Sequence, residues 1–102
     1  MAEYNLPEDV DEAFLKEADE RALASGDPGE LMMYKIMGEK GKHVYAAGSW
    51  LSWKLECAGA PSETRSSLCF KAGQLALFEP DPWDISQRLY KEYLETHKED
   101  SE

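Results

Sequence analysis

The chain has 102 residues, which is enough for one domain with a single core and too few for two. Its hydrophobic content of 42% and aromatic content of 11% indicate that it folds. The formal net charge of −10 argues against direct binding to nucleic acid or to an anionic membrane, because both carry charge of the same sign. It favours solubility, or a protein partner with a basic surface.

The sequence predicts a cytoplasmic location without a membrane partner. No N-terminal stretch joins a basic start to an apolar run, so no signal peptide is expected. No segment reaches the roughly 18 apolar residues that are needed to span a bilayer. Cys57 and Cys69 are too few for a disulfide framework, so both thiols are expected to be reduced.

The first predicted element is a helix over residues 7–24. Pro7 suits a first helical turn, and the acidic residues that follow it complement the helix dipole. Gly26 is a suitable C-terminal stop. An apolar face with four-residue steps, expected to pack on the core, consists of Val10, Phe14, Ala18 and Ala22.

The second predicted helix begins at Pro28 and runs about ten residues to Gly38. Because it is apolar almost all round, it is expected to be short and well buried. Its methionines are assigned to the core, with an adaptable binding surface as the alternative. Residues 39–43 are expected to form a polar link.

The stretch from residue 44 to residue 58 contains two of the three tryptophans and is expected to form the core. Alternation from Leu51 to Cys57 is typical of a half-buried strand, whereas a helical repeat that includes Val44 and Leu55 fits equally well. The whole chain holds only six Val, Ile and Thr residues, which are the residues that strands favour. Composition therefore favours a helix.

Two further helices are expected, over residues 62–78 and 82–96, with Ser62 as a cap and Pro82 as a first helical residue. Residues 97–102 are expected to fray.

The predicted fold is all-α, a single domain over residues 1–102 that forms a small bundle of four to five short helices. The alternative is an α+β fold in which residues 50–57, 67–71 and 74–78 form a three-stranded antiparallel sheet. N- and C-terminal helices would then pack on that sheet.

The sequence contains no catalytic, cofactor or metal motif. His43 and His97 are far apart, and eleven residues separate the two cysteines, so zinc ligands at short spacings are missing. Paired carboxylates such as Glu8 and Glu12 fall on an expected solvated face, without the burial that tunes a general acid. We therefore expect no enzymatic activity, no cofactor and no metal.

Charge and aromatic content define two candidate partner surfaces. Residues 1–30 carry a net charge of −8 and residues 79–102 one of −5, whereas residues 31–78 carry +3. The acidic candidate surface consists of Glu8, Asp9, Glu12, Asp19, Glu20, Asp84, Glu92 and Glu95. The apolar candidate surface consists of Met32, Met33, Tyr45, Trp50, Trp53 and Trp83. Since a small bundle has difficulty enclosing two adjacent indoles, one of Trp50 and Trp53 is expected to reach the surface.

Two functions are compatible with these surfaces. The first is an inhibitor or regulator that occupies a basic site on a nucleic-acid-handling or defence complex. In size, acidity and lack of a catalytic motif the chain resembles the inhibitors that phages make against host enzymes, and its location would then be the host cytoplasm. Carboxylates would imitate phosphates, and binding would be sensitive to salt. The alternative is a helical adaptor, chaperone or assembly subunit that binds a partner, or a second copy as a homodimer, through the apolar surface.

Overall fold

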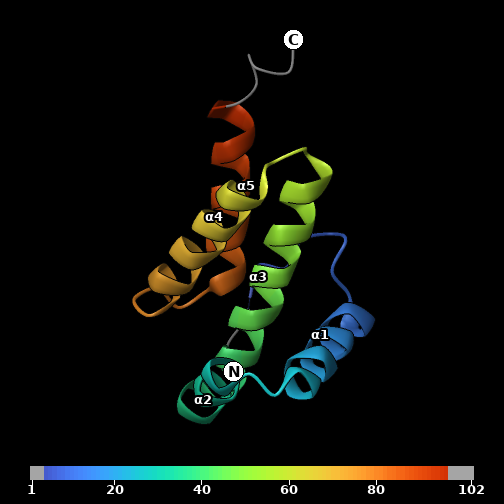
Figure 1. The fold of residues 1–102 in the computed structure, drawn as a ribbon, viewed down its shortest axis with the longest axis vertical. Helices are drawn as coiled ribbons and strands as arrows, with labels where there is room; N and C mark the ends of the chain where they lie inside the picture. Colours follow the sequence, from blue (N-terminus) through green and yellow to red (C-terminus); the bar gives the residue numbers. More distant parts are fainter. Residues whose placement is uncertain (1–3, 97–102) are drawn as a thin grey trace.

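Five helices make up the computed structural model, which describes residues 4–96 apart from the side chains of Glu30, Met33 and Tyr34. They are α1 (Glu12–Ser25), α2 (Pro28–Met37), α3 (Glu39–Cys57), α4 (Ser62–Ala76) and α5 (Pro82–Thr96) (Figure 1). No strand occurs within residues 4–96, so the fold is all-α and the three-stranded alternative is wrong. The expected frayed tail, residues 97–102, lies outside the described residues.

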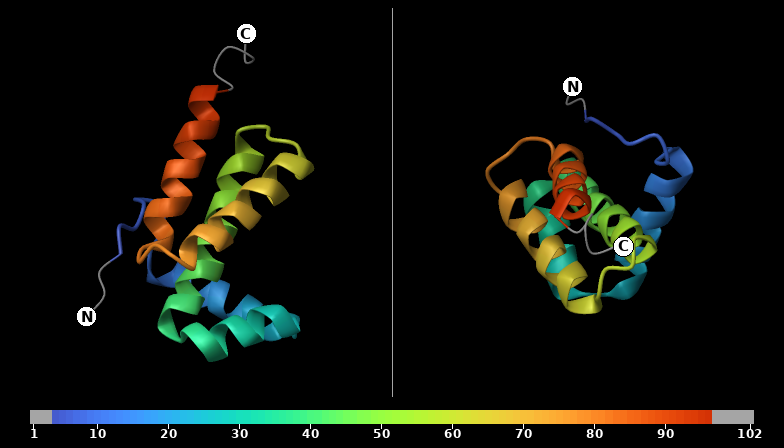
Figure 2. Two further views of the ribbon diagram at one scale, coloured as in Figure 1. Left: turned by 90° about the vertical axis from the view of Figure 1, so that its left-hand side faces the viewer. Right: turned by 90° about the horizontal axis from the view of Figure 1, so that it is seen from above.

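Helix α3 is the axis of the bundle, and each of the other four helices packs against it (Figures 1 and 2). Its buried side chains follow helical spacing and include Ala46, Ala47, Trp50, Leu51 and Leu55. The small residues let neighbouring helices approach α3 closely, and the large ones fill the space between them. The prediction that this stretch is helical and forms the core is therefore confirmed.

Helix α5 supplies most of the remaining large core residues. Ile85 and Leu89 are buried in the core. The buried Ser86 hydroxyl donates a hydrogen bond of 3.1 Å to the carbonyl of Ala47, which joins α5 to α3. Asp81 caps α5, because its Oδ1 accepts from two backbone N–H groups of the first turn. The predicted start of this helix at residue 82 is confirmed.

Helix α1 begins at Glu12, so the predicted start at residue 7 is wrong. Asp11 is the N-cap, and its Oδ1 accepts a hydrogen bond of 2.9 Å from the backbone N–H of Phe14. A capping aspartate pairs an N–H group that would otherwise lack a partner, which a proline in the first turn does not do. The residues before Asp11 form a non-helical segment, residues 4–10, which we call the N-terminal segment.

Three other predicted boundaries also differ from the structure. Residues 39–43 are the first turn of α3 and not a polar link, because the chain turns within one residue at Gly38. The φ angle of Gly38 is +61°, which glycine adopts readily. Ser62 is the first residue of α4, and the N-cap is Pro61, which makes no capping hydrogen bond through its side chain. Helix α4 ends at residue 76 and not at residue 78.

The N-terminal segment is tied to α3 through Asp9. The indole N–H of Trp50 donates to Asp9 Oδ1 at 2.8 Å, and Lys54 Nζ lies 2.9 Å from Asp9 Oδ2. Burial alone would raise the pKa of the Asp9 carboxyl, but the hydrogen bonds from Lys54 and Trp50 outweigh it and lower the pKa. Asn5 extends the attachment to α5, since its carbonyl accepts from Gln87 and its N–H donates to Asp81.

His43 joins the other end of the N-terminal segment to α5. The indole N–H of the fully buried Trp83 donates to His43 Nδ1 at 2.9 Å. The ring of Tyr4 stacks on the imidazole with a centroid distance of 4.2 Å. Burial lowers the pKa of His43, although Glu39 and Asp81 act in the opposite direction. The neutral imidazole is therefore the form that fits this site.

Most of the described side chains of α2 are exposed, so for them the prediction of a well-buried helix is wrong. Leu31, Met32 and Ile36 are exposed, and Ile36 retains 73% of its accessible surface. Helix α2 crosses the end of α3 instead of entering the bundle (Figure 2). The fold has no room for a buried α2, because α1, α4 and α5 already surround the core side chains of α3.

Acidification is expected to weaken the fold through His43. Burial lowers the pKa of His43 in the folded state below the value of 6.5 that the unfolded chain has, and protonation of Nδ1 also removes the acceptor of the buried Trp83 N–H. The unfolded state then binds more protons, and the free energy of unfolding falls as the pH drops through about 6.5. Urea denaturation between about pH 7.5 and 5.5 measures this loss.

His43→Gln is the control for that experiment, because the amide oxygen accepts a hydrogen bond but does not titrate. Its stability should change less over the same pH range. An equal loss of stability in the variant and in the natural sequence would contradict the assignment to His43.

Candidate binding surface

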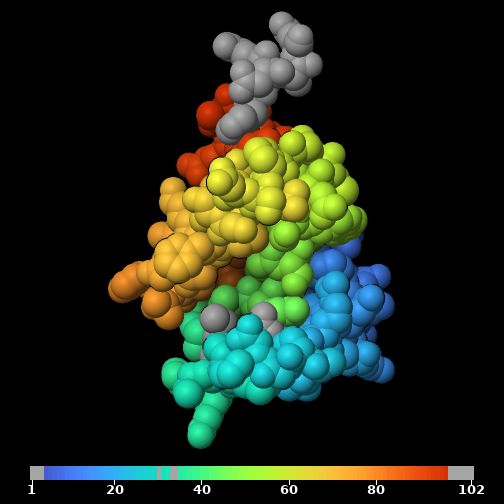
Figure 3. Space-filling view, viewed as in Figure 1, coloured from blue at the N-terminus to red at the C-terminus, as the bar shows by residue number. Residues whose placement is uncertain are grey.

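A groove lined by uncharged residues lies on one face of the bundle. It has a cavity volume of about 350 Å³ and lies between α3 and α4, with α5 at its base. Figure 3 shows the hollow, with α4 above it, α2 below it and α3 visible inside it. The lining consists of Val44, Tyr45, Ala47, Gly48, Ser49, Ser52, Cys69, Ala72, Gly73, Pro82 and Ser86.

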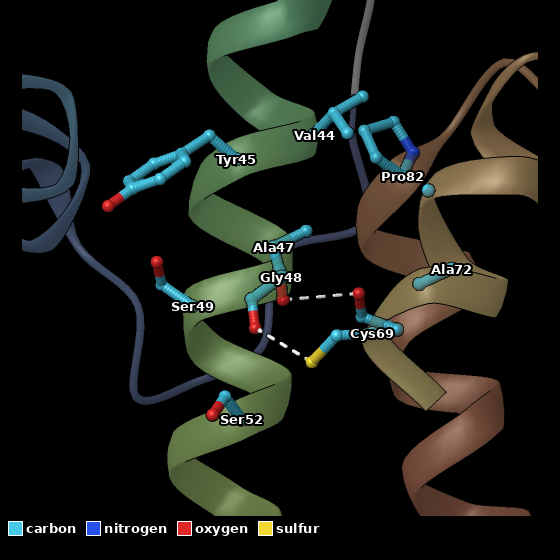
Figure 4. Close-up of a pocket in the computed structure, with 11 residues that line it drawn as sticks. Val44, Tyr45, Ala47, Gly48, Ser49, Ser52, Cys69, Ala72 and Pro82 are labelled. Carbon is cyan, nitrogen blue, oxygen red and sulfur yellow. Dashed lines mark hydrogen bonds between the residues drawn. The ribbon is translucent and has the colours of Figure 1, made fainter. Parts of the chain in front are cut away.

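The groove contains no charged side chain, and its polar groups are partly used within the chain. The Cys69 thiol donates to the Gly48 carbonyl with a distance of 3.6 Å, as Figure 4 shows. Burial raises the pKa of this thiol, with a smaller opposing effect from Arg65, so the reactive thiolate is disfavoured. Tyr45, Ser49 and Ser52 lie on the side of α3 turned away from α4. The groove therefore suits an uncharged occupant and offers no activated nucleophile.

Two glycines of the groove have open space above them. A methyl group added at Gly48 of α3 or at Gly73 of α4 would meet no atom within 4 Å, apart from its own helix and chain neighbours. Glycine inside a helix costs about 1 kcal/mol relative to alanine. Since no contact within the chain requires these glycines, packing of this fold does not explain them.

Large apolar side chains are exposed beside this groove. Within residues 4–96 the exposed ones are Leu6, Leu23, Leu31, Met32, Ile36, Trp53, Phe70, Leu77, Phe78 and Leu94. Six of them belong to α2 or to α4 and the turn that follows it. Exposed apolar side chains that gather into a patch on a folded protein are typical of an interaction site.

The structure buries some residues of the apolar candidate surface and exposes others. Trp50 and Trp83 are buried and hydrogen-bonded within the chain, so their assignment to a partner surface is wrong. Trp53 is the tryptophan that reaches the surface, with 43% of its area exposed. Tyr45 lines the groove and Met32 is exposed on α2, while the side chain of Met33 lies outside the description.

Five exposed residues of this surface were missed from the sequence, namely Leu31, Ile36, Phe70, Leu77 and Phe78. Helix α4 carries apolar residues on two opposite faces, and the face that packs in the core consists of Leu68, Ala72, Leu75 and Ala76. In both α2 and α4, apolar residues spread over more of the helix surface than one buried face accounts for. That spread was the signal available in the sequence.

The acidic residues do not form one uninterrupted face. Asp9 is paired with Lys54, and Arg88 lies 3.9 Å from Asp84 and 2.9 Å from Glu79. Asp19 is half-buried, and its Oδ1 has no hydrogen-bond partner among the described residues. The exposed members are Glu8 on the N-terminal segment, Glu12 and Glu20 on α1, and Glu92 and Glu95 on α5.

Two searches for other kinds of site within the described chain give negative findings. No group of three or more His, Cys, Asp and Glu side chains in that part of the chain is placed to hold a metal ion. None of the described helices combines the length and apolar character that crossing a membrane requires.

No family model matches the chain, and no curated protein or solved structure matches it.

The two cysteines are expected to differ in reactivity. Cys57 is exposed, whereas Cys69 is half-buried in the groove, donates a hydrogen bond and has a raised pKa. A chromogenic disulfide reagent should therefore modify the Cys57 thiol at least about tenfold faster than the Cys69 thiol. Cys57→Ser should remove the fast phase and Cys69→Ser the slow one. A fast phase that survives in Cys57→Ser would show that the Cys69 thiol is not shielded as described.

Proposed function

We propose that this chain is a non-enzymatic protein-binding module that holds its partner on α2 and the adjoining groove. The observation that carries the proposal is the position of α2. It is the most apolar of the five helices, and yet Leu31, Met32 and Ile36 are exposed to solvent. Covering such a side chain contributes on the order of 1–2 kcal/mol, so three of them supply a useful part of a binding energy.

The groove adds depth to this surface. Its volume of about 350 Å³ is at the lower end of the range for pockets that enclose a ligand, so it can admit a large side chain from a partner. Because its lining is uncharged, the inserted group would be apolar or neutral. Affinity then comes from apolar contact and depends little on salt.

The acidic residues have a supporting role in this proposal. Glu12 and Glu20 are exposed on α1, in a part of the chain with a strongly negative net charge. Such charges accelerate the approach of a partner with a basic rim more than they strengthen the final complex. An inhibitor that uses these carboxylates as its main contacts is the competing function, and the following experiment separates the two.

Capture from a lysate of the organism that makes the protein tests this function with two matched variants. Met32→Ser with Ile36→Ser removes exposed apolar area, and Glu12→Lys with Glu20→Lys reverses exposed charge. We expect a captured protein to stay bound through a high-salt wash, to fall at least about tenfold with the first variant and to persist with the second. Circular dichroism would verify that both variants keep their helices.

The opposite pattern would contradict the proposal. A protein that is released by salt and lost only on charge reversal would assign binding to the acidic residues and favour the inhibitor of a basic site.

A further inference from the structure

Helix α4 carries a second apolar stripe on its outer face. Ser66, Phe70, Gly73 and Leu77 follow one another at steps of four, three and four residues, which is the spacing of the seam of a coiled coil. Phe70 is 70% exposed and Leu77 is 60% exposed. Leu77 continues the helical backbone with φ −69° and ψ −24°, so it projects along the same face. The opposite face of α4 packs in the core.

Residue size alternates along this stripe, in the order small, large, small, large. Gly73 has open space above it, since a methyl group added there would meet no atom within 4 Å beyond its helix and chain neighbours. The pairs 66/77 and 70/73 are centred on the same point of the helix, between residues 71 and 72. A twofold axis through this point, perpendicular to the helix, therefore places each large residue opposite a small one.

We propose that two copies of this chain form a homodimer through antiparallel α4 helices. Phe70 of one copy packs onto Gly73 of the second copy, and Leu77 packs onto Ser66. This is the layer arrangement of an antiparallel coiled coil, in which a knob from one helix enters a hole on the other. A parallel pair would place Phe70 against Phe70 and Gly73 against Gly73, which crowds one layer and leaves the next one empty.

Charge along the stripe permits this contact in spite of the net charge of −10. The residues that flank the stripe are Ser67, Cys69, Gln74 and Ala76, and none of them is charged. Most acidic residues lie in residues 1–30 and 79–102, outside α4. The remaining repulsion acts at long range and is screened by salt, so dimerisation should strengthen as salt is raised from a low concentration. An electrostatic interface would weaken instead.

A twofold interface also accounts for both outward features of α4. It covers the exposed Phe70 and Leu77 and gives the open space above Gly73 an occupant. Because the same patch serves both copies, the assembly closes at two and does not grow into a filament. Helix α2 takes no part in this contact, whereas Gly73 also lines the groove, so the dimer would cover the α4 edge of the groove and leave α2 free for a partner.

Analytical ultracentrifugation of the full chain tests the dimer. We expect a concentration-dependent mass that rises from 11.6 kDa towards twice this value. Phe70→Ser and Gly73→Leu should each raise the dissociation constant at least about tenfold. Gly73→Leu should also stabilise the monomer, because it replaces a glycine inside a helix where the chain leaves space. Ile36→Ser is the matched control, since Ile36 is similarly exposed but lies on α2.

Cysteine cross-linking tests the antiparallel arrangement in a background with Cys57→Ser and Cys69→Ser. A mixture of Ser66→Cys and Leu77→Cys chains should form a mixed disulfide, because these positions face each other across the axis. Neither variant alone should cross-link, since identical positions would lie about 16 Å apart along the helices, beyond the reach of a disulfide.

Three results would overturn the proposal. They are a monomer mass at every concentration, unchanged association in Gly73→Leu, and disulfides that form as readily within one variant as in the mixture. Loss of association in Ile36→Ser would show that the interface lies on α2 and not on α4. Failure to capture a partner from lysate would contradict the proposed function but not the dimer.

Discussion

Two buried indole N–H groups impose the constraint on which this fold depends. Trp50 and Trp83 fill the core, and each must find a hydrogen-bond acceptor, because an unpaired buried N–H costs about 1–3 kcal/mol. Asp9 and His43 are the acceptors, at 2.8 and 2.9 Å. The first bond holds the N-terminal segment on α3, and the second joins α3 to α5. Polar contacts therefore select the arrangement of elements that apolar contacts stabilise.

The same arrangement explains where the molecule remains open. Helices α1, α4 and α5 cover the sides of α3 that carry large apolar residues, whereas the remaining side carries Gly48, Ser49 and Ser52 and forms the groove (Figures 3 and 4). With the core complete, α2 and the outer face of α4 keep apolar side chains in solvent. We propose a different occupant for each surface, another protein for α2 and a second copy of the chain for α4.

Local signals in the sequence were enough to predict the fold class, and long-range contacts account for most of what was missed. The scarcity of β-branched residues identified α3 as a helix, and Pro82 marked the start of α5. The partners Asp9–Trp50 and His43–Trp83 are separated by 41 and 40 positions, so no local pattern could indicate that these tryptophans are occupied inside the chain. Burial of α2 was inferred from its apolar composition, which is the same for a core helix and for an interface helix. The stripe on α4 follows from spacing alone, but spacing does not tell which of two apolar faces a helix buries.

Hydrogen exchange of the three tryptophan indoles, followed by nuclear magnetic resonance on protein labelled with nitrogen-15, tests the central claim most directly. Two indole N–H signals, from Trp50 and Trp83, should exchange slowly, and the signal of the exposed Trp53 should exchange fast. Asp9→Asn keeps an acceptor but removes its charge, so it should shift the Trp50 signal and leave the Trp83 signal in place. Fast exchange at all three indoles, or a Trp50 signal that does not respond to Asp9→Asn, would contradict this account of the fold.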